Sequence, residues 1–328
     1  MRFLLTDEQR EFARSLDALL TASDTPAVVR AWAAGDHGPG LGLWRRLAEA
    51  GVFALAVPEA YGGVGPLPVE TAVAFVELGR HGVPGPVVES VAAAVLLGAV
   101  GGPAAGEWLP GIADGTAVAS LALGAYGPYA LDADVAEAVF VVAGDELRLA
   151  RGPGRPTSSM DPARRLFRPE AGGEAAASGA RVREAATAAG TWATFATAAQ
   201  ALGCGEALLR ATVAYAKQRT QFGVPIGSFQ AVKHRLADTL LGLEFARPLL
   251  YGAAVELAEG APGAGAAVAA AKVAAGEAAY AAARTALHLH GAVGYTEELD
   301  LAWWLRRARP LRDAWGTPSA CRARVLAG

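Results

Sequence analysis

A basic turn followed by glycine and proline is the part of this chain whose residue types most clearly suit chemistry. Residues Tyr215–His234 predict a helix that ends near Lys217, a Gly/Pro loop, and a new helix that starts near Ser228. Such a turn presents the guanidinium of Arg219 together with backbone donors, a combination that binds phosphate. Taken alone, Arg219 also fits a solvated helix end where its charge opposes the helix dipole.

A second glycine turn follows a long helical stretch nearer the C-terminus. Residues His288–Leu301 predict the end of one helix, a turn and the start of another. His288 and His290 stand two positions apart on a helix, so they point to different sides, and no third ligand is evident nearby. We therefore expect no metal site here.

Both segments resemble a known flavoprotein family. Tyr215–His234 closely resembles the signature of flavin-dependent acyl-CoA dehydrogenases, and the resemblance implies FAD as the cofactor. It also implies that Arg219 contacts the pyrophosphate of FAD held by a neighbouring subunit. Gln221 then stands where the family has a hydrogen-bond donor, and Phe222 and Gln230 line the cofactor site.

The second turn is similar to the family's Gln-Leu-His-Gly-Gly-Ile-Gly-Tyr-Thr loop, with two departures. By resemblance, His288, Gly291 and Ala292 lie close to the adenosine-pyrophosphate part of FAD. His288 stands at the Gln position and can still donate through a ring nitrogen. Ala292 stands at the second Gly position, where its methyl group opposes a close backbone approach.

The catalytic base of the family is missing from its usual place. The family keeps a Glu followed by Gly-Thr after its long C-terminal helices, and Leu311–Ser319 matches that run with Trp315 at the Glu position. An indole cannot accept the proton alpha to the thioester carbonyl. The other position that some members use falls near Trp192 and Ala193, which carry no carboxylate. Asp313 is a weak candidate for a replacement base.

Helices and a short β-module must hold these segments. Helical periodicity starts after the N-cap candidate Thr6 and returns from about Thr191, whereas short apolar runs near 117–123 and 138–142 predict strands. We expect a mainly α fold with a small central β-domain, similar to acyl-CoA dehydrogenases: an N-terminal helical domain, a middle β-module and a C-terminal four-helix bundle. The expected bounds are 1–114, 115–185 and 186–328.

The resemblance also extends to the N-terminal and middle modules, where it differs in strength. The segments Leu47–Gly65 and Val83–Ser90 also resemble the family's first domain, so the resemblance reaches all three modules in order. In the middle module, the family's Thr-Glu-Pro-like and Gly-Ser-Asp-like stretch and its Trp-containing flavin cover are not found. The resemblance therefore implies a module shortened where the family holds the isoalloxazine and the thioester.

Composition bounds the remaining possibilities. The net charge of -3 gives no overall reason to expect nucleic-acid or membrane binding. The two cysteines and the absence of a signal-like start favour a cytoplasmic protein with reduced thiols.

Three functional hypotheses stay open. The first is a base-lacking subunit of a heteromeric acyl-CoA dehydrogenase, which acts on an acyl-CoA thioester with a catalytic partner subunit. The second is a self-sufficient flavoenzyme, either with a relocated base or with a reaction that does not require the usual proton abstraction. A homo-oligomer is the alternative to the hetero-oligomer. The third is a non-enzymatic scaffold, because fold alone does not fix function.

Overall fold

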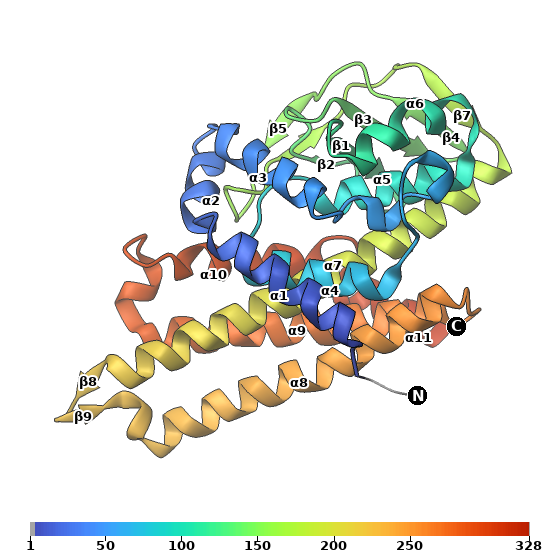
Figure 1. Ribbon diagram of the computed structural model, residues 1–328. Coiled ribbons are helices and arrows are strands. Elements are labelled where there is room, and N and C mark those ends of the chain that lie inside the picture. The colour runs from blue at the N-terminus through green and yellow to red at the C-terminus, as the bar shows by residue number, and fades with distance from the viewer. Residues whose placement is uncertain (1–3, 328) are drawn as a thin grey trace. The chain divides into compact units, whose positions relative to one another are not determined.

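Helices make up most of the chain, and nearly all strands lie in one stretch near its middle (Figure 1). The computed structural model describes residues 4–327. The first helices are α1 (Asp7–Thr21), α2 (Thr25–Ala33), α3 (Gly38–Glu49), α4 (Pro68–Arg80), α5 (Val87–Val100) and α6 (Gly102–Ala113). The strands that follow are β1 (Ala119–Leu123), β2 (Ala130–Leu131), β3 (Ala138–Ala143), β4 (Glu146–Leu149), β5 (Arg155–Thr157), β6 (Leu166–Arg168) and β7 (Ala175–Ser178). The C-terminal elements are α7 (Ala180–Gln218), β8 (Thr220–Gln221), β9 (Val224–Pro225), α8 (Gln230–Ala258), α9 (Ala264–His290), α10 (Leu301–Asp313) and α11 (Pro318–Ala327). The predicted fold class, mainly α with a small β-module, is confirmed.

The chain forms two compact units that interleave along the sequence. The first unit combines residues 1–26, 75–82 and 197–328, and the second combines 27–74 and 83–196. Helices α4 and α7 each contribute residues to both units. The three consecutive modules predicted from the sequence stay a prediction. The two compact units are each built from separate stretches of the chain, so their bounds cannot be compared directly with those of the modules.

The first unit is a helical bundle built on small side chains. Helix α9 packs against α8, α10 and α11, and most of its buried residues are alanines. Two glycines show how closely the backbones approach: a methyl group on Gly203 would lie 1.9 Å from the backbone oxygen of Val76, and one on Gly79 would lie 2.1 Å from that of Gln200. Small residues at such crossings let helices pack at short distance.

The second unit carries the β-module. One sheet has the order β1-β3-β4-β7, in which β1 and β3 are parallel and the other pairs antiparallel, and a second sheet has the order β2-β6-β5. Strand β1 is buried along its whole length, as expected for a strand covered on both faces. Helix α5 lies against β1, and the Ser90 hydroxyl donates to the Ala119 oxygen at 2.6 Å.

Several elements differ from the sequence prediction. Helix α7 begins at Ala180, about ten residues before the predicted return of helix, because its first turns are alanine-rich and carry little apolar periodicity. Strand β7 consists of Ala and Ser, which favour strands weakly, and was not predicted. Helix α6 was also missed, since Gly and Pro occur inside it.

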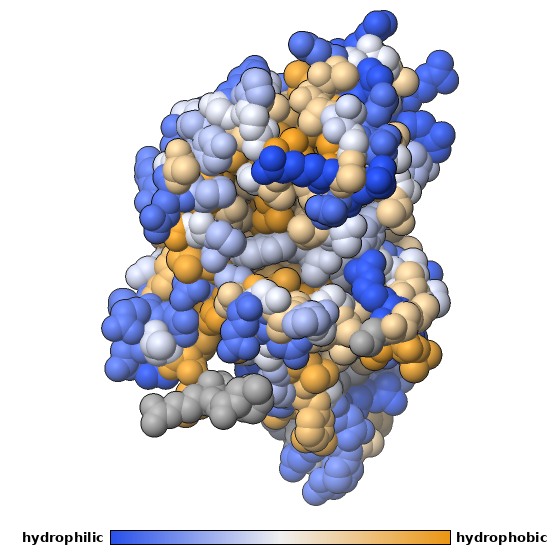
Figure 2. Space-filling view, turned by 90° about the vertical axis from the view of Figure 1, so that its right-hand side faces the viewer, coloured by the Kyte–Doolittle hydropathy of each residue, from blue (hydrophilic) through white to orange (hydrophobic). Residues whose placement is uncertain are grey.

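The surface mixes apolar and polar residues. On the face shown in Figure 2, hydrophobic residues lie in several patches among hydrophilic ones. Scattered apolar residues are normal on a protein surface, so a partner face has to be argued from particular exposed side chains. Within the described residues, no helix combines the length and apolar character needed to span a membrane.

Candidate functional site

A tight hairpin carries three of the residues predicted to meet the cofactor. Strands β8 and β9 pair across a two-residue turn formed by Phe222 and Gly223, whose φ angles are 54° and 79°. Two positive φ angles are the geometry of the primed hairpin turns. A bulky residue rarely adopts this conformation, yet Phe222 does so with its side chain 93% exposed. The hairpin therefore holds an aromatic ring out in solvent at a conformational cost.

The polar residues of this hairpin are also exposed. Arg219 directly follows the last residue of α7, and its backbone nitrogen donates to the Tyr215 oxygen at 2.8 Å. Within the described residues, the side chains of Arg219, Gln221 and Gln230 make no hydrogen bond or ion pair. These side chains are available to a ligand or a second chain.

A cavity of about 550 Å³ lies between α8 and α9 and contains two of the predicted residues, His288 and Gly291. Arg235 from α8 and Arg284 from α9 line it as well. In the part of the chain that the structure describes, neither guanidinium has a hydrogen bond or an ion pair. The cavity thus offers two unpaired cations and an exposed imidazole, a donor set that suits a pyrophosphate.

The sequence prediction missed the two arginines of this cavity. Arg284 and His288 are four positions apart on α9 and so share a face, and this spacing was the available signal. Arg235 comes from another helix, so only the fold places it there. Ala292 does not line the cavity: it is exposed in the short helix Gly291–Tyr295.

The hairpin and the cavity lie at the same end of the helical unit. The hairpin joins the end of α7 to the start of α8, while the cavity is lined by the first turns of α8 and the last turns of α9 (Figure 1). The structure therefore gathers the predicted cofactor residues at one end of the bundle. Arg219, Gln221 and Phe222 do not line the cavity itself.

The loop at the usual base position is buried and anchored. Trp315 lies between α10 and α11 with 8% of its surface exposed and a φ of 53°. The ammonium group of Lys272, itself only 2% exposed, donates to the oxygen of Arg312 at 2.8 Å and to that of Gly316 at 3.2 Å. The indole is thus held in a fixed, strained loop, where it offers no proton acceptor.

Neither alternative supplies an obvious base. Asp313 forms an ion pair with Arg309, 3.3 Å between Oδ2 and Nε, and its side chain is 39% exposed. Trp192 is buried against Phe195 in an edge-on ring contact, and Ala193 is fully buried. The two positions where the resemblance places a base therefore hold an indole and a small apolar residue.

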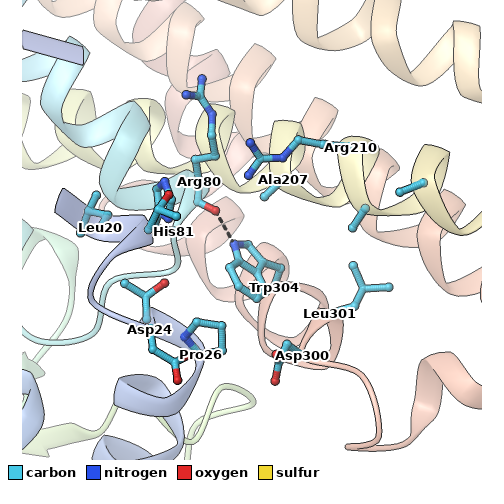
Figure 3. Close-up of a pocket in the computed structure, with 14 residues that line it drawn as sticks. Leu20, Asp24, Pro26, Arg80, His81, Ala207, Arg210, Asp300, Leu301 and Trp304 are labelled. Carbon is cyan, nitrogen blue, oxygen red and sulfur yellow. Dashed lines mark hydrogen bonds between the residues drawn. The ribbon is translucent and has the colours of Figure 1, made fainter. Parts of the chain in front are cut away.

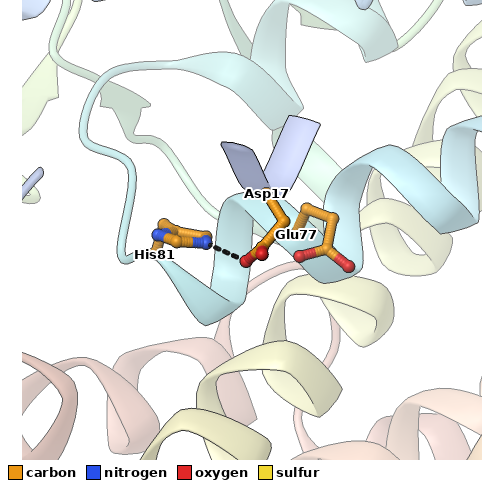
Figure 4. A group of neighbouring side chains, drawn as sticks. All are labelled: Asp17, Glu77 and His81. Carbon is orange, nitrogen blue, oxygen red and sulfur yellow. Dashed lines mark hydrogen bonds and ion pairs between the residues drawn. The ribbon is translucent and has the colours of Figure 1, made fainter. Parts of the chain in front are cut away.

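A second group of titratable residues lies elsewhere in the helical unit. Asp17 from α1 lies beside Glu77 and His81, and the His81 Nε2 is 2.8 Å from the Asp17 Oδ1 (Figure 4). Both Glu77 oxygens already accept from Arg80 at 2.5 and 2.6 Å, and Arg80 also pairs with Glu206. This group is an ion-pair network, because the Arg80 guanidinium already binds both oxygens of Glu77.

Burial dominates the electrostatics of this network. Desolvation raises the pKa of Glu77 to about 7, despite the opposing charge of Arg80. Burial also lowers the pKa of His81, although its hydrogen bond to Asp17 acts the other way. His81 is thus neutral at pH 7, and its Nε2–H donates a hydrogen bond to the Asp17 carboxylate.

Comparison with known proteins decides the family. The family model for the N-terminal domain of acyl-CoA dehydrogenases matches residues 6–116, and the model for their C-terminal domain matches residues 183–327. The acyl-CoA dehydrogenase IpdE2 of Mycobacterium tuberculosis is 38% identical over 305 residues, which cover 92% of this chain and 91% of that protein. This chain belongs to the acyl-CoA dehydrogenase family. Acyl-CoA dehydrogenases are FAD-dependent oxidoreductases, so the resemblance stated from the sequence is confirmed.

Other members of the family extend the likeness. IpdE2 of Mycolicibacterium smegmatis is 32% identical and covers 95% of this chain and 96% of its own length. The ChsE4-ChsE5 complex from M. tuberculosis contains a chain with a TM-score of 0.85 and 27% identity, covering 100% of this chain and 98% of that one. A chain of a steroid acyl-CoA dehydrogenase, Tcur3481-Tcur3483, gives a TM-score of 0.84 at 27% identity, covering 98% of this chain and 97% of that one.

Proposed function

We propose that this chain is the base-lacking subunit of a heteromeric acyl-CoA dehydrogenase that introduces an α,β double bond into an acyl-CoA thioester. A catalytic partner subunit supplies the base, and this chain supplies residues at the edge of the cofactor site. The observation that carries the proposal is the buried, anchored Trp315 at the position of the family's base. Similarity to a protein of the ChsE4-ChsE5 complex supports a heteromeric assembly.

The cofactor-edge residues fit the phosphate-bearing half of FAD. When bound, FAD supplies the acceptor for the hydride that leaves the β carbon. Arg235 and Arg284 hold unpaired positive charge in a cavity of about 550 Å³, and His288 adds a ring nitrogen. Their role is to bind and orient the pyrophosphate through charge-assisted hydrogen bonds. Gly291 leaves the approach open, because a methyl group built on it would meet no atom within 4 Å.

The hairpin fits a role between subunits. Phe222 is exposed and held in a strained conformation, and strain of this kind persists where function requires it. With Arg219 unpaired beside it, the hairpin presents a ring and a cation that this chain does not use internally. A neighbouring subunit's cofactor is the partner that the family resemblance implies.

An apolar stripe on α8 supports an oligomer. Leu241, Phe245 and Leu249 are 53%, 72% and 46% exposed and recur every four residues, so they form one face. In a chain that stays monomeric, polar residues would be expected at these three positions. A second subunit packed on this face would bury them.

Co-expression tests the proposal. The chain is produced together with a base-carrying acyl-CoA dehydrogenase from the same organism. The mixture is then separated by size-exclusion chromatography, with absorbance recorded at flavin wavelengths. We expect one flavin-containing peak that holds both chains. Separate elution with no gain of flavin contradicts the proposal, and a yellow, active preparation of this chain alone favours the self-sufficient enzyme instead.

The variant for this experiment is Phe222→Ala, with a control on α11, outside the hairpin. Phe222→Ala removes the exposed ring, whereas Val325→Ala removes an exposed apolar residue of α11. We expect the flavin content of the complex to fall with the first and to stay unchanged with the second. Equal flavin content for both variants argues against the hairpin's part in the site.

A further inference from the structure

A second cavity, outside the cofactor-edge site, lies wholly within the helical unit. It has a volume of about 500 Å³. It is lined by the end of α1, the turn after it and the start of α2, by the end of α4, by the C-terminal third of α7 and by the start of α10 (Figure 3). Leu20, Pro26, Ala207 and Leu301 give it apolar walls. Volume and lining are those of cavities that bind small organic molecules.

An indole forms one wall of this cavity. The Nε1 of Trp304 donates to the Arg80 oxygen at 3.0 Å, which satisfies the polar atom of the ring and fixes its orientation (Figure 3). The ring is packed on Gly82, where a methyl group would lie 3.3 Å from it. Trp304 is half-buried, and its remaining surface is an apolar wall suited to a ring or a chain.

Two opposite charges at this cavity lack a partner. Within the described residues, Arg210 and Asp24 make no side-chain hydrogen bond and no ion pair. The neighbouring charges are already engaged, since Arg80 pairs with Glu77 and Glu206, and His81 bonds to Asp17. Arg210 is therefore the available cation of the cavity.

The charges are arranged about the indole. In Figure 3, Arg210 lies on one side of Trp304, and Asp24 and Asp300 lie on the other. An organic anion would pair with Arg210 but would also face the carboxylates of Asp24 and Asp300. An organic cation would pair with a carboxylate but would also face the Arg210 guanidinium. Like-charge contacts of that kind are unfavourable, whereas a ligand with both charges meets a complement at each end.

We propose that this cavity binds a small zwitterion whose carboxylate pairs with Arg210, whose ammonium group pairs with Asp24, and whose apolar body packs on Trp304. The carboxylate can accept two hydrogen bonds from the guanidinium fork. Both protein charges are exposed, so each pair adds modest affinity, and the apolar contact adds the rest. The site is separate from the cofactor-edge site and does not depend on the proposed function.

Three related probes test the proposal on the full chain. 4-(Aminomethyl)phenylacetate carries a charge at each end of its ring, 4-methylphenylacetate only the carboxylate, and 4-methylbenzylamine only the ammonium group. Binding is followed by the NMR shift of the Trp304 indole N–H, assigned with Trp304→Phe. We expect 4-(aminomethyl)phenylacetate to bind about three- to fivefold more tightly than either single-charge probe, as the loss of one exposed ion pair implies.

Variants separate the two ends. Arg210→Met should weaken the binding of 4-(aminomethyl)phenylacetate about three- to fivefold and leave that of 4-methylbenzylamine no weaker. Asp24→Asn should weaken 4-(aminomethyl)phenylacetate by a similar factor and leave 4-methylphenylacetate no weaker. Asn tolerates the φ of 45° at position 24, and both sites are exposed, so the fold is expected to persist, as circular dichroism can verify. Arg155→Met, on the exposed strand β5, is the control. Equal affinity for all three probes, or no shift with any, overturns the proposal.

Discussion

Lys272 lies buried in α9 and donates a hydrogen bond to the backbone oxygen of Gly316, the residue that follows Trp315. The same ammonium group bonds the Arg312 oxygen near the end of α10, so one side chain fixes both ends of the loop. Gly316 has a φ of 124°, and a methyl group there would lie 2.7 Å from the Cys321 sulfur. The loop that carries Trp315 is thus held at both ends by one buried side chain.

The first prediction concerns this anchor. Lys272→Met keeps much of the side-chain volume but leaves two carbonyl oxygens without their donor. Each lost bond to a buried group costs roughly 1–3 kcal/mol, partly offset because the buried charge disappears. We expect the free energy of unfolding in urea to fall, while Lys233→Met on the exposed start of α8 leaves it unchanged. Equal stability of both variants would show that Lys272 does not hold the loop.

The second prediction concerns the hairpin tip. Phe222→Gly relieves the strain of a positive φ at a position where the ring makes little contact with its own chain. The gain, about 1–3 kcal/mol for the relieved strain, exceeds the roughly 1 kcal/mol that glycine costs in the unfolded chain. Thermal unfolding should therefore shift upward, while flavin content of the complex falls. A variant that is less stable and binds flavin normally contradicts this account.

The fold was largely readable from sequence, whereas the arrangement of the site was only partly so. Helical spacing and the Gly/Pro loop predicted the helix ends that flank Arg219 and carry His288, since both depend on local rules. The short hairpin of β8 and β9 within that loop was not predicted. Arg235 and Lys272 were not predicted, because their importance arises from helices that meet only in the folded chain. Strand β7 was missed since alanine and serine give little local signal.

A third prediction tests the phosphate-binding role of the cavity between α8 and α9. Arg284→Met and Arg235→Met each remove one unpaired cation and should weaken ADP about tenfold, the effect of losing a charged hydrogen bond of roughly 1.5 kcal/mol. Raising the salt concentration should reduce the difference between native and variant chains. Titration calorimetry with ADP measures both effects, and Arg155→Met serves as the control. Unchanged affinity in both variants would remove the cavity from the cofactor site.

The pH dependence of stability gives a fourth prediction. The pKa of Glu77 is raised to about 7 in the folded chain, above its ordinary value of 4.5. Its contribution to stability is therefore complete below pH 4.5 and is lost as the pH rises through about 7. Glu77→Gln mimics the protonated group, so its stability relative to the native chain should rise between pH 5 and pH 8 by at most about 3 kcal/mol. A difference that is constant over this range, or falls, contradicts the raised pKa.

The central claim is that the base of the reaction belongs to the partner subunit and that Trp315 takes no part in proton removal. The most direct measurement is acyl-CoA turnover by the assembled complex, after replacement of either the partner's catalytic glutamate by glutamine or Trp315 by phenylalanine. The account predicts that the first change abolishes turnover and that the second preserves it to within about threefold, less than 1 kcal/mol in the barrier. Turnover that survives loss of the partner's glutamate but disappears with Asp313→Asn would contradict it.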